Sequence, residues 1–284
     1  TYIPYDQYTS LREAVEYAAT LSKETGDFAT VSFDSNVFWN NPVLNKKTFM
    51  SGYDAAYAFN DSTAKIVIDG MITHTDSDTG IISTGRMTLT SHDGAGLTRA
   101  SHNYFTTISV YSGSLKLENL IFLGPGTGGS AVDGDAQFIV VRGGALYTDN
   151  VLFKDGIADS TLSHQVTGGA IILRGGGSGS IELNNTEFYN NTASQIVKIF
   201  GGSAKDYVFD GVKFDRNHDF KQILSYYNTA SQAQDYAIYI RNSEFTNNYN
   251  GGNIIYSQWN TNYNAPSFIV SRTVFRDNST TGTM

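Results

Sequence analysis

Short apolar runs, separated by Gly, Asn, Asp and Ser, make up most of the chain from residue 66 onward. Each run spans three to six residues, which is short for a helix and typical of a β-strand between turns. Two further runs precede them, at Thr30–Phe33 and Lys65–Ile68. The later runs are Met87–Leu89, Thr107–Val110, Leu115–Leu117, Phe138–Val141, Ala145–Tyr147, Ala170–Leu173, Ile196–Phe200, Tyr236–Ile240, Asn253–Tyr256 and Phe268–Val270.

Phenylalanine recurs through this region at a nearly constant interval. Subtraction gives steps of 31, 35, 26, 31 and 30 residues between Phe122, Phe153, Phe188, Phe214, Phe245 and Phe275. A period in this range is the signature of a stacked repeat architecture. Four of the six are followed three residues later by an asparagine, at Asn191, Asn217, Asn248 and Asn278. We predict one column of stacked phenyl rings, and beside it an asparagine ladder in a turn that tolerates left-handed backbone.

Two or three strands per period fit one turn of a parallel β-helix, with successive turns ~4.8 Å apart. The sequence therefore predicts an all-β, parallel β-helix, with its coils over residues 64–284 as one domain. Residues 1–63 are predicted to form an N-terminal cap, because the open end of a solenoid needs covering. A capping box at Ser10–Glu13 predicts a short amphipathic helix over about residues 10–21, ended by Gly26. Residues 38–59 are aromatic-rich and irregular.

Composition removes several classes of function. A formal net charge of -8 argues against nucleic acid as a partner. The absence of cysteine excludes disulfides and thiolate zinc sites, and the five histidines are scattered. No apolar run approaches the ~18 residues that span a bilayer, and no signal peptide opens the chain at Thr1. We expect a fragment without a membrane-spanning segment. If the protein is exported, we expect this to be the mature fragment, without its signal or anchor.

Several short motifs resemble those of bacterial and archaeal surface proteins. Gly-Gly-Ala-Ile/Leu at 143–146 and 168–171, together with Phe-x-x-Asn, resembles the repeats of polymorphic outer-membrane proteins and related adhesin-like proteins. Ser10–Ala14 is similar to the Cys-Ser-Leu-Arg-Glu-Ala box that opens other large surface proteins, with Thr9 at the Cys position. Val31–Phe33 followed by Asp34, Ile66–Gly70 and Leu117–Phe122 follow in the same order. The resemblance implies an all-β, right-handed, single-stranded parallel β-helix (a pectate-lyase-like solenoid) on an extracellular surface protein, with adhesion as its function.

The same fold class also contains polysaccharide lyases, polygalacturonases and depolymerases, so the fold alone does not exclude an enzyme. The Asn-Thr-Asp, Asp-Asp, Gly-His-Gly and Arg-Ile-Lys signatures of polygalacturonases are missing, as is the Trp-Ile-Asp-His signature of pectate lyases. The nearest substitute for these catalytic signatures is a group of mostly acidic residues around one coil. We expect these residues to lie in a solvated turn, with side chains that do not share one face. The group consists of Asp206, Asp210, Asp215, Arg216, His218 and Asp219. Asp76/Asp78 and Asp133/Asp135 are weak calcium candidates.

Aromatic residues in the last three repeats form the candidate binding site. One phenylalanine column does not use all of the 13% aromatic content. If the stacked coils place the remaining rings on one side, they form a platform for a glycan or an extended peptide, with asparagine amides beside them. Packing of these tyrosines against the helix wall is the alternative. The predicted ligand-binding residues are Tyr226, Tyr227, Tyr249, Trp259 and Tyr263, beside Asn228, Asn250, Asn260 and Asn262.

The sequence favours a non-catalytic, ligand-binding region of a cell-surface adhesin, extracellular and attached through parts outside this fragment. We expect its partner to be a glycan or a host or matrix protein, the fragment to be monomeric, and no cofactor to be needed. The alternatives are a polysaccharide lyase or depolymerase with its acids near Asp210, or a structural spacer whose function is reach.

Overall fold

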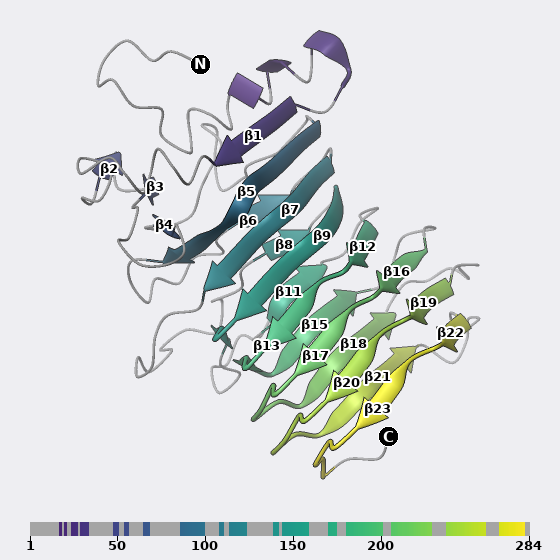
Figure 1. The fold of residues 1–284 in the computed structure, drawn as a ribbon. Coiled ribbons are helices and arrows are strands. Elements are labelled where there is room, and N and C mark those ends of the chain that lie inside the picture. Colours follow the sequence, from purple (N-terminus) through teal and green to yellow (C-terminus); the bar gives the residue numbers. More distant parts are fainter. Residues whose placement is uncertain are drawn as a thin grey trace.

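A computed structural model describes residues 17–18, 20–21, 24–27, 29–33, 48–50, 54–56, 65–68, 86–99, 108–110, 114–123, 139–141, 144–158, 170–174, 180–200, 206–228, 237–259 and 267–281. These residues form a parallel β-solenoid, in which successive coils stack along one axis from the N-terminal to the C-terminal end (Figure 1). This confirms the predicted fold class. Most of the strands line three faces of the coil.

The first face belongs to a 13-stranded sheet in which neighbouring strands are parallel and in register. Strand β9 lies at its centre, pairing with β7 on one edge and with β12 on the other. The strands of this face are β7 (Ser114–Leu123), β9 (Ala145–Lys154), β12 (Ser180–Asn184), β16 (Tyr207–Asp210), β19 (Ala237–Arg241) and β22 (Ser267–Ser271).

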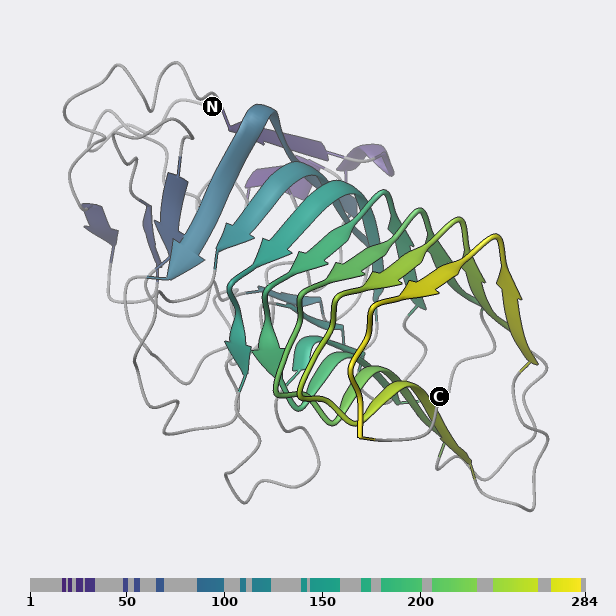
Figure 2. The same cartoon turned by 60° about the horizontal axis from the view of Figure 1, so that its bottom comes forward.

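The second face is the continuation of the same sheet around a bend (Figure 2). It carries β13 (Glu187–Tyr189), β17 (Lys213–Asp215), β20 (Glu244–Thr246) and β23 (Val274–Arg276), while the second half of β9 pairs with β13. The residue at the bend has a positive φ in every coil from β7 onward, and most of these residues are asparagines, which adopt left-handed backbone at little cost. They are Asn119, Asn150, Asn185, Gly211, Asn242 and Arg272.

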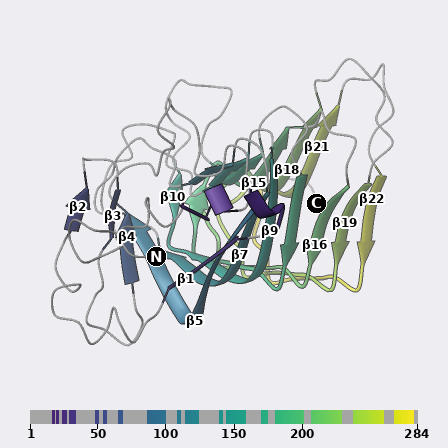
Figure 3. The same ribbon diagram turned by 90° about the horizontal axis from the view of Figure 1, so that it is seen from above.

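The third face is a separate six-stranded parallel sheet. Figure 3 shows β15, β18 and β21 lying across from β16, β19 and β22, with the interior between the two layers. The strands, in their order along the sheet, are β6 (Ile108–Val110), β8 (Ile139–Val141), β11 (Ala170–Arg174), β15 (Gln195–Phe200), β18 (Gln222–Asn228) and β21 (Asn253–Trp259). A small parallel pair, β10 (Ile157–Ala158) and β14 (Thr192–Ala193), links two coils.

Strands near the N-terminal end also join the 13-stranded sheet. Strands β1 (Ala29–Phe33) and β4 (Lys65–Ile68) both pair in parallel with the long strand β5 (Arg86–Arg99), which in turn pairs with β7. Because β7 occupies one edge of β5, β1 and β4 share the other edge. Strands β2 (Thr48–Met50) and β3 (Asp54–Ala56) form an antiparallel pair.

Part of the predicted capping helix is described. Residues 17–18, 20–21 and 24–25 are helical, and the rest of the predicted 10–21 segment lies outside the described residues. Ala18, on the predicted apolar face, is buried in the hydrophobic core. Gly26 has a φ of 76°, the left-handed conformation that ends helices, as the sequence predicts.

Alternation of inward and outward side chains explains the core. In β12 the burial alternates strictly, with Ile181 and Leu183 fully buried and their neighbours partly exposed. Register then stacks equivalent positions from coil to coil into interior columns. One such column contains Leu117, Thr148, Leu183, Phe209, Ile240 and Val270.

The predicted phenylalanine column is present. Phe122, Phe153, Phe188, Phe214, Phe245 and Phe275 are register partners on the second face. Consecutive ring centroids lie 4.8–5.0 Å apart, with interplanar angles between 5° and 22°. Each ring covers the face of the next, so the five rings before the last are completely buried. The terminal ring, Phe275, is 40% exposed because no described coil lies beyond it.

The predicted asparagine ladder is also present. The Asn217 Oδ1 accepts hydrogen bonds from the Asn191 backbone N–H and Nδ2, at 3.1 and 3.0 Å. The Asn217 Nδ2 donates to the Phe188 carbonyl at 2.9 Å, and the same pattern repeats at Asn248 and Asn278. The four side chains thus satisfy backbone groups of the preceding coil that would otherwise be buried without partners.

One detail of that prediction is wrong. The ladder asparagines do not have left-handed backbone; the residue immediately before each of them does. These preceding residues are Asn190, Arg216, Asn247 and Asp277, with φ between 53° and 56°. The left-handed residue turns the chain inward, and the asparagine that follows can then point its amide into the buried ladder.

Candidate ligand-binding face

The outward surface of the third sheet carries the candidate site. Along β18, Leu224 and Tyr226 point inward: both are buried, and the Tyr226 ring meets Phe268 of the first face edge-on at 6.3 Å between centroids. Ser225 and Tyr227 therefore point to the opposite, outward side of the sheet, where Ser225 is covered and Tyr227 is partly exposed. Register places Lys198 beside Ser225 and Phe200 beside Tyr227, on the same outward surface.

Three aromatic rings, one from each of three consecutive coils, lie next to one another on this surface: Phe200 and Tyr227 are register partners, and Tyr256 lies two residues before Gln258, the register partner of Tyr227. We call Phe200, Tyr227 and Tyr256 the outer aromatic row. The Tyr227 ring centroid lies 5.7 Å from that of Phe200 and 5.6 Å from that of Tyr256, and the rings are tilted by 34° and 49°. All three side chains are partly exposed. The row can therefore offer apolar ring surface to a ligand lying along the axis of the solenoid.

Lys198 lies at the base of the row. Its Nζ is 4.9 Å from the Phe200 ring centroid and 5.4 Å from that of Tyr227, within the range of cation–π contacts. The residue is only 6% exposed. Burial, with a smaller contribution from the charge of Lys221, lowers the pKa of the Lys198 ammonium. Among the residues that the structure describes, no carboxylate forms an ion pair with it.

Two glutamines lie next to the row. The Gln195 Nε2 donates to Gln222 Oε1 at 2.9 Å, and the Tyr227 hydroxyl donates to the same oxygen over a long 3.4 Å contact. Gln195 Oε1 is buried and accepts no hydrogen bond within the described part of the chain. Burial and the nearby Tyr256 raise the pKa of the Tyr227 hydroxyl, so it stays protonated and able to donate at neutral pH.

The predicted platform does not form as a single surface, and Tyr226 is the clearest correction. It is completely buried, so its ring cannot contact a ligand from outside. The physical reason is the two-residue period of a strand, which turns adjacent tyrosines to opposite sides. Tyr227 alone of this pair belongs to the outward surface.

The other predicted residues are separated from Tyr227. Tyr249 is 41% exposed and stacks on His218 at 5.0 Å, in the turn that precedes β21. The register places Tyr227 beside Gln258, near the end of β21, so Tyr249 and Tyr227 lie at opposite ends of these strands. Trp259 ends β21 and pairs with Asn228, while its side chain, like Tyr263, Asn260 and Asn262, lies outside the described residues. Asn250 adopts left-handed backbone in the turn.

The acidic group near Asp210 connects neighbouring coils. Asp210 accepts hydrogen bonds from Arg241 Nε at 2.7 Å and Asn242 Nδ2 at 2.6 Å, and Asp206 accepts one from the Ala237 N–H at 2.7 Å. The hydrogen bond from Asn242 lowers the pKa of the Asp210 carboxyl and outweighs the opposing effect of burial. The hydrogen bond and the charge of Arg241 lower this pKa further.

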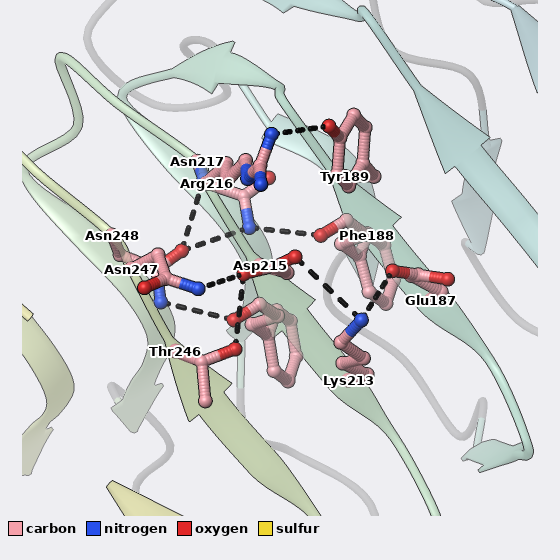
Figure 4. Close-up of polar contacts among 11 residues, drawn as sticks. Glu187, Phe188, Tyr189, Lys213, Asp215, Arg216, Asn217, Thr246, Asn247 and Asn248 are labelled. Atoms are coloured by element: carbon pink, nitrogen blue, oxygen red, sulfur yellow. Dashed lines mark hydrogen bonds and ion pairs between the residues drawn. The ribbon is translucent and has the colours of Figure 1, made fainter. Parts of the chain in front are cut away.

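Asp215 corrects the expectation of a solvated turn, because it is 7% exposed. It accepts hydrogen bonds from Asn247 Nδ2 at 2.8 Å and Thr246 Oγ1 at 3.0 Å, both from the next coil (Figure 4). Lys213 lies 3.6 Å away and also pairs with Glu187. Burial opposes ionisation, but these hydrogen bonds and the ammonium outweigh it and lower the pKa of the Asp215 carboxyl. As predicted, Asp210 and Asp215 lie on different faces, at the ends of β16 and β17.

The two candidate calcium sites of the sequence, the Asp-x-Asp pairs at 76–78 and 133–135, lie outside the described residues. Within the described ranges, no group of three or more His, Cys, Asp or Glu side chains is arranged to hold a metal ion.

No protein-family model, no curated protein and no solved structure matches the chain. The class to which the protein belongs, a parallel β-solenoid, is therefore established by its coordinates. In the described part of the chain, no helix has the length and hydrophobicity needed to cross a membrane.

Sequence reasoning missed Phe200, Tyr256 and Lys198. Alignment of the repeats on the phenylalanine column would have placed the three aromatic residues only approximately, because Phe200, Tyr227 and Tyr256 follow their column residues by 12, 13 and 11 positions. The register pairs Lys198 with Ser225 and Ser225 with Tyr256. A mixed row of Phe, Tyr and Tyr does not show the exact repetition that marks the interior column.

Proposed function

We propose that this chain is a non-catalytic binding region of a cell-surface, adhesin-like protein, and that it recognises a glycan through the outer aromatic row. The observation that carries the proposal is the contact of Tyr227 with both Phe200 and Tyr256 on the outward side of the third sheet. Rings that hold the fold together are buried, as in the phenylalanine column, whereas these three are partly exposed.

The chemistry of the row suits a sugar chain. Aromatic rings pack against the apolar faces of pyranose rings, and the spacing of one ring per coil is comparable to the length of one sugar unit. Polar groups beside the rings, including Gln222 and the Tyr227 hydroxyl, can exchange hydrogen bonds with sugar hydroxyls. Sites of this kind combine apolar walls with a few convergent polar groups.

Asp210 and Asp215, in the acidic group considered for catalysis, do not have the property that a glycosidase acid needs. A glycosidase needs one carboxyl group whose pKa is raised so that it can protonate the leaving group. The pKa values of Asp210 and Asp215 are both lowered, and both carboxylates accept hydrogen bonds from the next coil. These residues stabilise the stacking of coils instead.

The location on a cell surface rests on the resemblance of the Gly-Gly-Ala, Phe-x-x-Asn and Ser10–Ala14 motifs to those of extracellular adhesin-like proteins. The parallel β-solenoid is consistent with such a protein, because stacked coils present one long surface with equivalent positions repeated along it. In this role the fragment acts as a monomer and needs no cofactor.

The test is an array of glycans and matrix proteins probed with the wild-type fragment and a triple variant, Phe200→Ser, Tyr227→Ser and Tyr256→Ser. We expect the wild type to bind a restricted set of glycans and the triple variant to lose at least about tenfold in affinity, since each aromatic contact is worth ~1 kcal/mol. Tyr239→Ser, a partly exposed tyrosine on the first face, is the matched control and should bind as the wild type does.

Three outcomes would replace the proposal. Folded wild-type protein that binds nothing on the array would favour a spacer. New reducing ends or unsaturated products after incubation with polysaccharides would favour a lyase or depolymerase. Binding that survives in the triple variant would place the site elsewhere.

A further inference from the structure

The Lys198 ammonium is the least well compensated charge on the candidate face. Lys198 is only 6% exposed. Within the described residues, its amine contacts the rings of Phe200 and Tyr227. The neighbouring charge, Lys221, is of the same sign and makes the site more positive. A buried cation without an anion is costly, and most such lysines have a carboxylate partner.

Other lysines on the described surface show what is missing here. Lys213 lies 3.0 Å from Glu187 and 3.6 Å from Asp215, and the hydrogen bond from Lys213 to Glu187 raises its pKa. Lys198 lies deeper, and its pKa is lowered instead. The protein carries an excess of acidic groups overall, with a net charge of -8, but places none of its described carboxylates against this amine.

A second buried polar atom lies unpaired close by. Gln195, three residues before Lys198 on β15, is 5% exposed, and its Oε1 accepts no hydrogen bond in the described part of the chain. Its amide group contacts Gln222, which in turn contacts the Tyr227 hydroxyl. The base of the outer aromatic row therefore contains both an unmatched cation and an unmatched acceptor, which is the pattern of a site that is completed by a ligand.

We propose that the outer aromatic row binds an acidic glycan, a sugar chain with carboxylate groups, and that one carboxylate pairs with the Lys198 ammonium while the sugar rings pack along Phe200, Tyr227 and Tyr256. This inference rests on the proposed function and narrows it to one class of ligand. A sugar acid supplies an anion for the amine, hydroxyl donors for the amide oxygen, and apolar ring faces for the aromatic row. An acidic peptide supplies the anion without the ring faces.

The experiment uses matched ligands. One probe is a tetrasaccharide of alternating glucuronic acid and N-acetylglucosamine, and its partner is the same tetrasaccharide with the carboxyl groups reduced to alcohols. Further acidic oligosaccharides that carry uronic or sialic acids, each paired with its carboxyl-reduced form, and a poly-glutamate peptide complete the panel. Binding is measured by isothermal titration at low salt, because screening weakens charge pairing.

Lys198→Met is the decisive variant, because it keeps the apolar stem and removes only the charge. We expect at least one acidic probe to bind the wild type at least about tenfold more tightly than its reduced partner, and Lys198→Met to abolish that preference. The variant should unfold at the same or a higher denaturant concentration than the wild type, since the buried charge is removed. Lys213→Met, on the second face, is the matched control and should keep the preference.

The failure of this inference differs from the failure of the proposed function. If acidic and reduced sugars bind equally, and the triple variant of the aromatic row loses both, the glycan-binding function stands and the acidic specificity is wrong. Tight binding of the poly-glutamate peptide alone would identify a peptide site instead. If no sugar in the panel binds but the glycan array yields a ligand, only the acidic specificity is wrong, and if neither yields a ligand, both proposals fail. A Lys198→Met protein that is destabilised while it retains full preference for acidic sugars would show a structural role for the amine.

Discussion

Two series of aromatic rings run along the same coils of this protein, one inside and one outside, and they differ in spacing, tilt, residue type and exposure. The inner series is the phenylalanine column, with centroids 4.8–5.0 Å apart and planes within 22° of parallel. The outer aromatic row has spacings of 5.6–5.7 Å and tilts of 34° and 49°. The column uses the same residue type in each coil, whereas the row contains one phenylalanine and two tyrosines.

The difference separates the residues that determine the fold from those available for function. A ring between two identical rings fixes the distance between coils, and any change of size or polarity leaves a cavity or a clash. A ring on the outward surface touches its neighbours on one side and solvent on the other, so its identity can change with the ligand. Regular repetition therefore indicates structure, and irregular placement of rings on the outward side, where Phe200 and Tyr227 share a register position and Tyr256 does not, indicates a surface that is free to specialise.

The largest expected effect comes from breaking the column at its centre. Phe214→Ala should reduce the free energy of unfolding by about 3–5 kcal/mol, the usual cost of replacing a fully buried phenylalanine by alanine. Phe214 is completely buried between Phe188 and Phe245, so the cavity has little room to collapse. Urea unfolding followed by circular dichroism measures the change.

The end of the column is the internal control for that variant. Phe275 has the same register position but is 40% exposed, so Phe275→Ala should cost less than half as much. Equal losses at both positions would contradict the stacked arrangement of the rings.

The next effect concerns the asparagine ladder. Asn217→Ala should lower the free energy of unfolding by about 1–3 kcal/mol, because the Phe188 carbonyl and the Asn191 N–H lose their buried partners. Asn278→Ala, at the more exposed end of the ladder, should cost less. Thermal unfolding of the two variants side by side makes the comparison, and an Asn217→Ala protein as stable as the wild type would show that water replaces the ladder.

A smaller loss is expected from the outer row. Phe200→Ala should reduce the free energy of unfolding by about 1 kcal/mol, because the ring is partly exposed and buries less apolar area than a column ring. The same urea experiment applies. A loss as large as that of Phe214→Ala would assign Phe200 to the structural set and weaken the case for the row as a binding surface.

The smallest expected effect depends on pH. The pKa of Asp215 is lowered in the folded protein, so its carboxylate contributes stability above the pKa of an unfolded aspartate, about 3.9, and that contribution is lost as the pH falls through the lower folded value. Unfolding of the wild type and Asp215→Asn between pH 7 and pH 2 measures it. The wild type should be the more stable above about pH 5, and its advantage should shrink as the pH falls. An advantage that does not change with pH would exclude the carboxylate as its source.

Much of the fold was predictable because stacked coils place the same residue type at the same position in each coil. The interval between the phenylalanines identifies the coil length, and the asparagine three positions later identifies a turn whose amides pair from coil to coil. The short strands that carry the column, such as β13 and β17, were missed as strands, since three residues give no measurable alternation. The left-handed position was placed one residue late, because asparagine occupies both that position and the next in the coil of Asn190.

The candidate site was predicted only in part, and Tyr226 and Tyr227 show why. Adjacent in the sequence and chemically identical, they point to opposite sides of β18, and only the register with Ile199 and Phe200 decides which one is inside. The unequal steps of 26 to 35 residues between column phenylalanines obscure that register in the sequence. Lys198 carried no signal at all, because a lysine in an apolar run is typically a solvated side chain.

The measurement that tests the central claim most directly is the affinity of Tyr227→Ala for a glycan bound by the wild type, taken together with its midpoint of urea unfolding on the same preparation. The division between an inner structural column and an outer binding row predicts a loss of affinity of about tenfold with the midpoint shifted only slightly. Unchanged affinity, or an affinity lost only in proportion to unfolding, would contradict it.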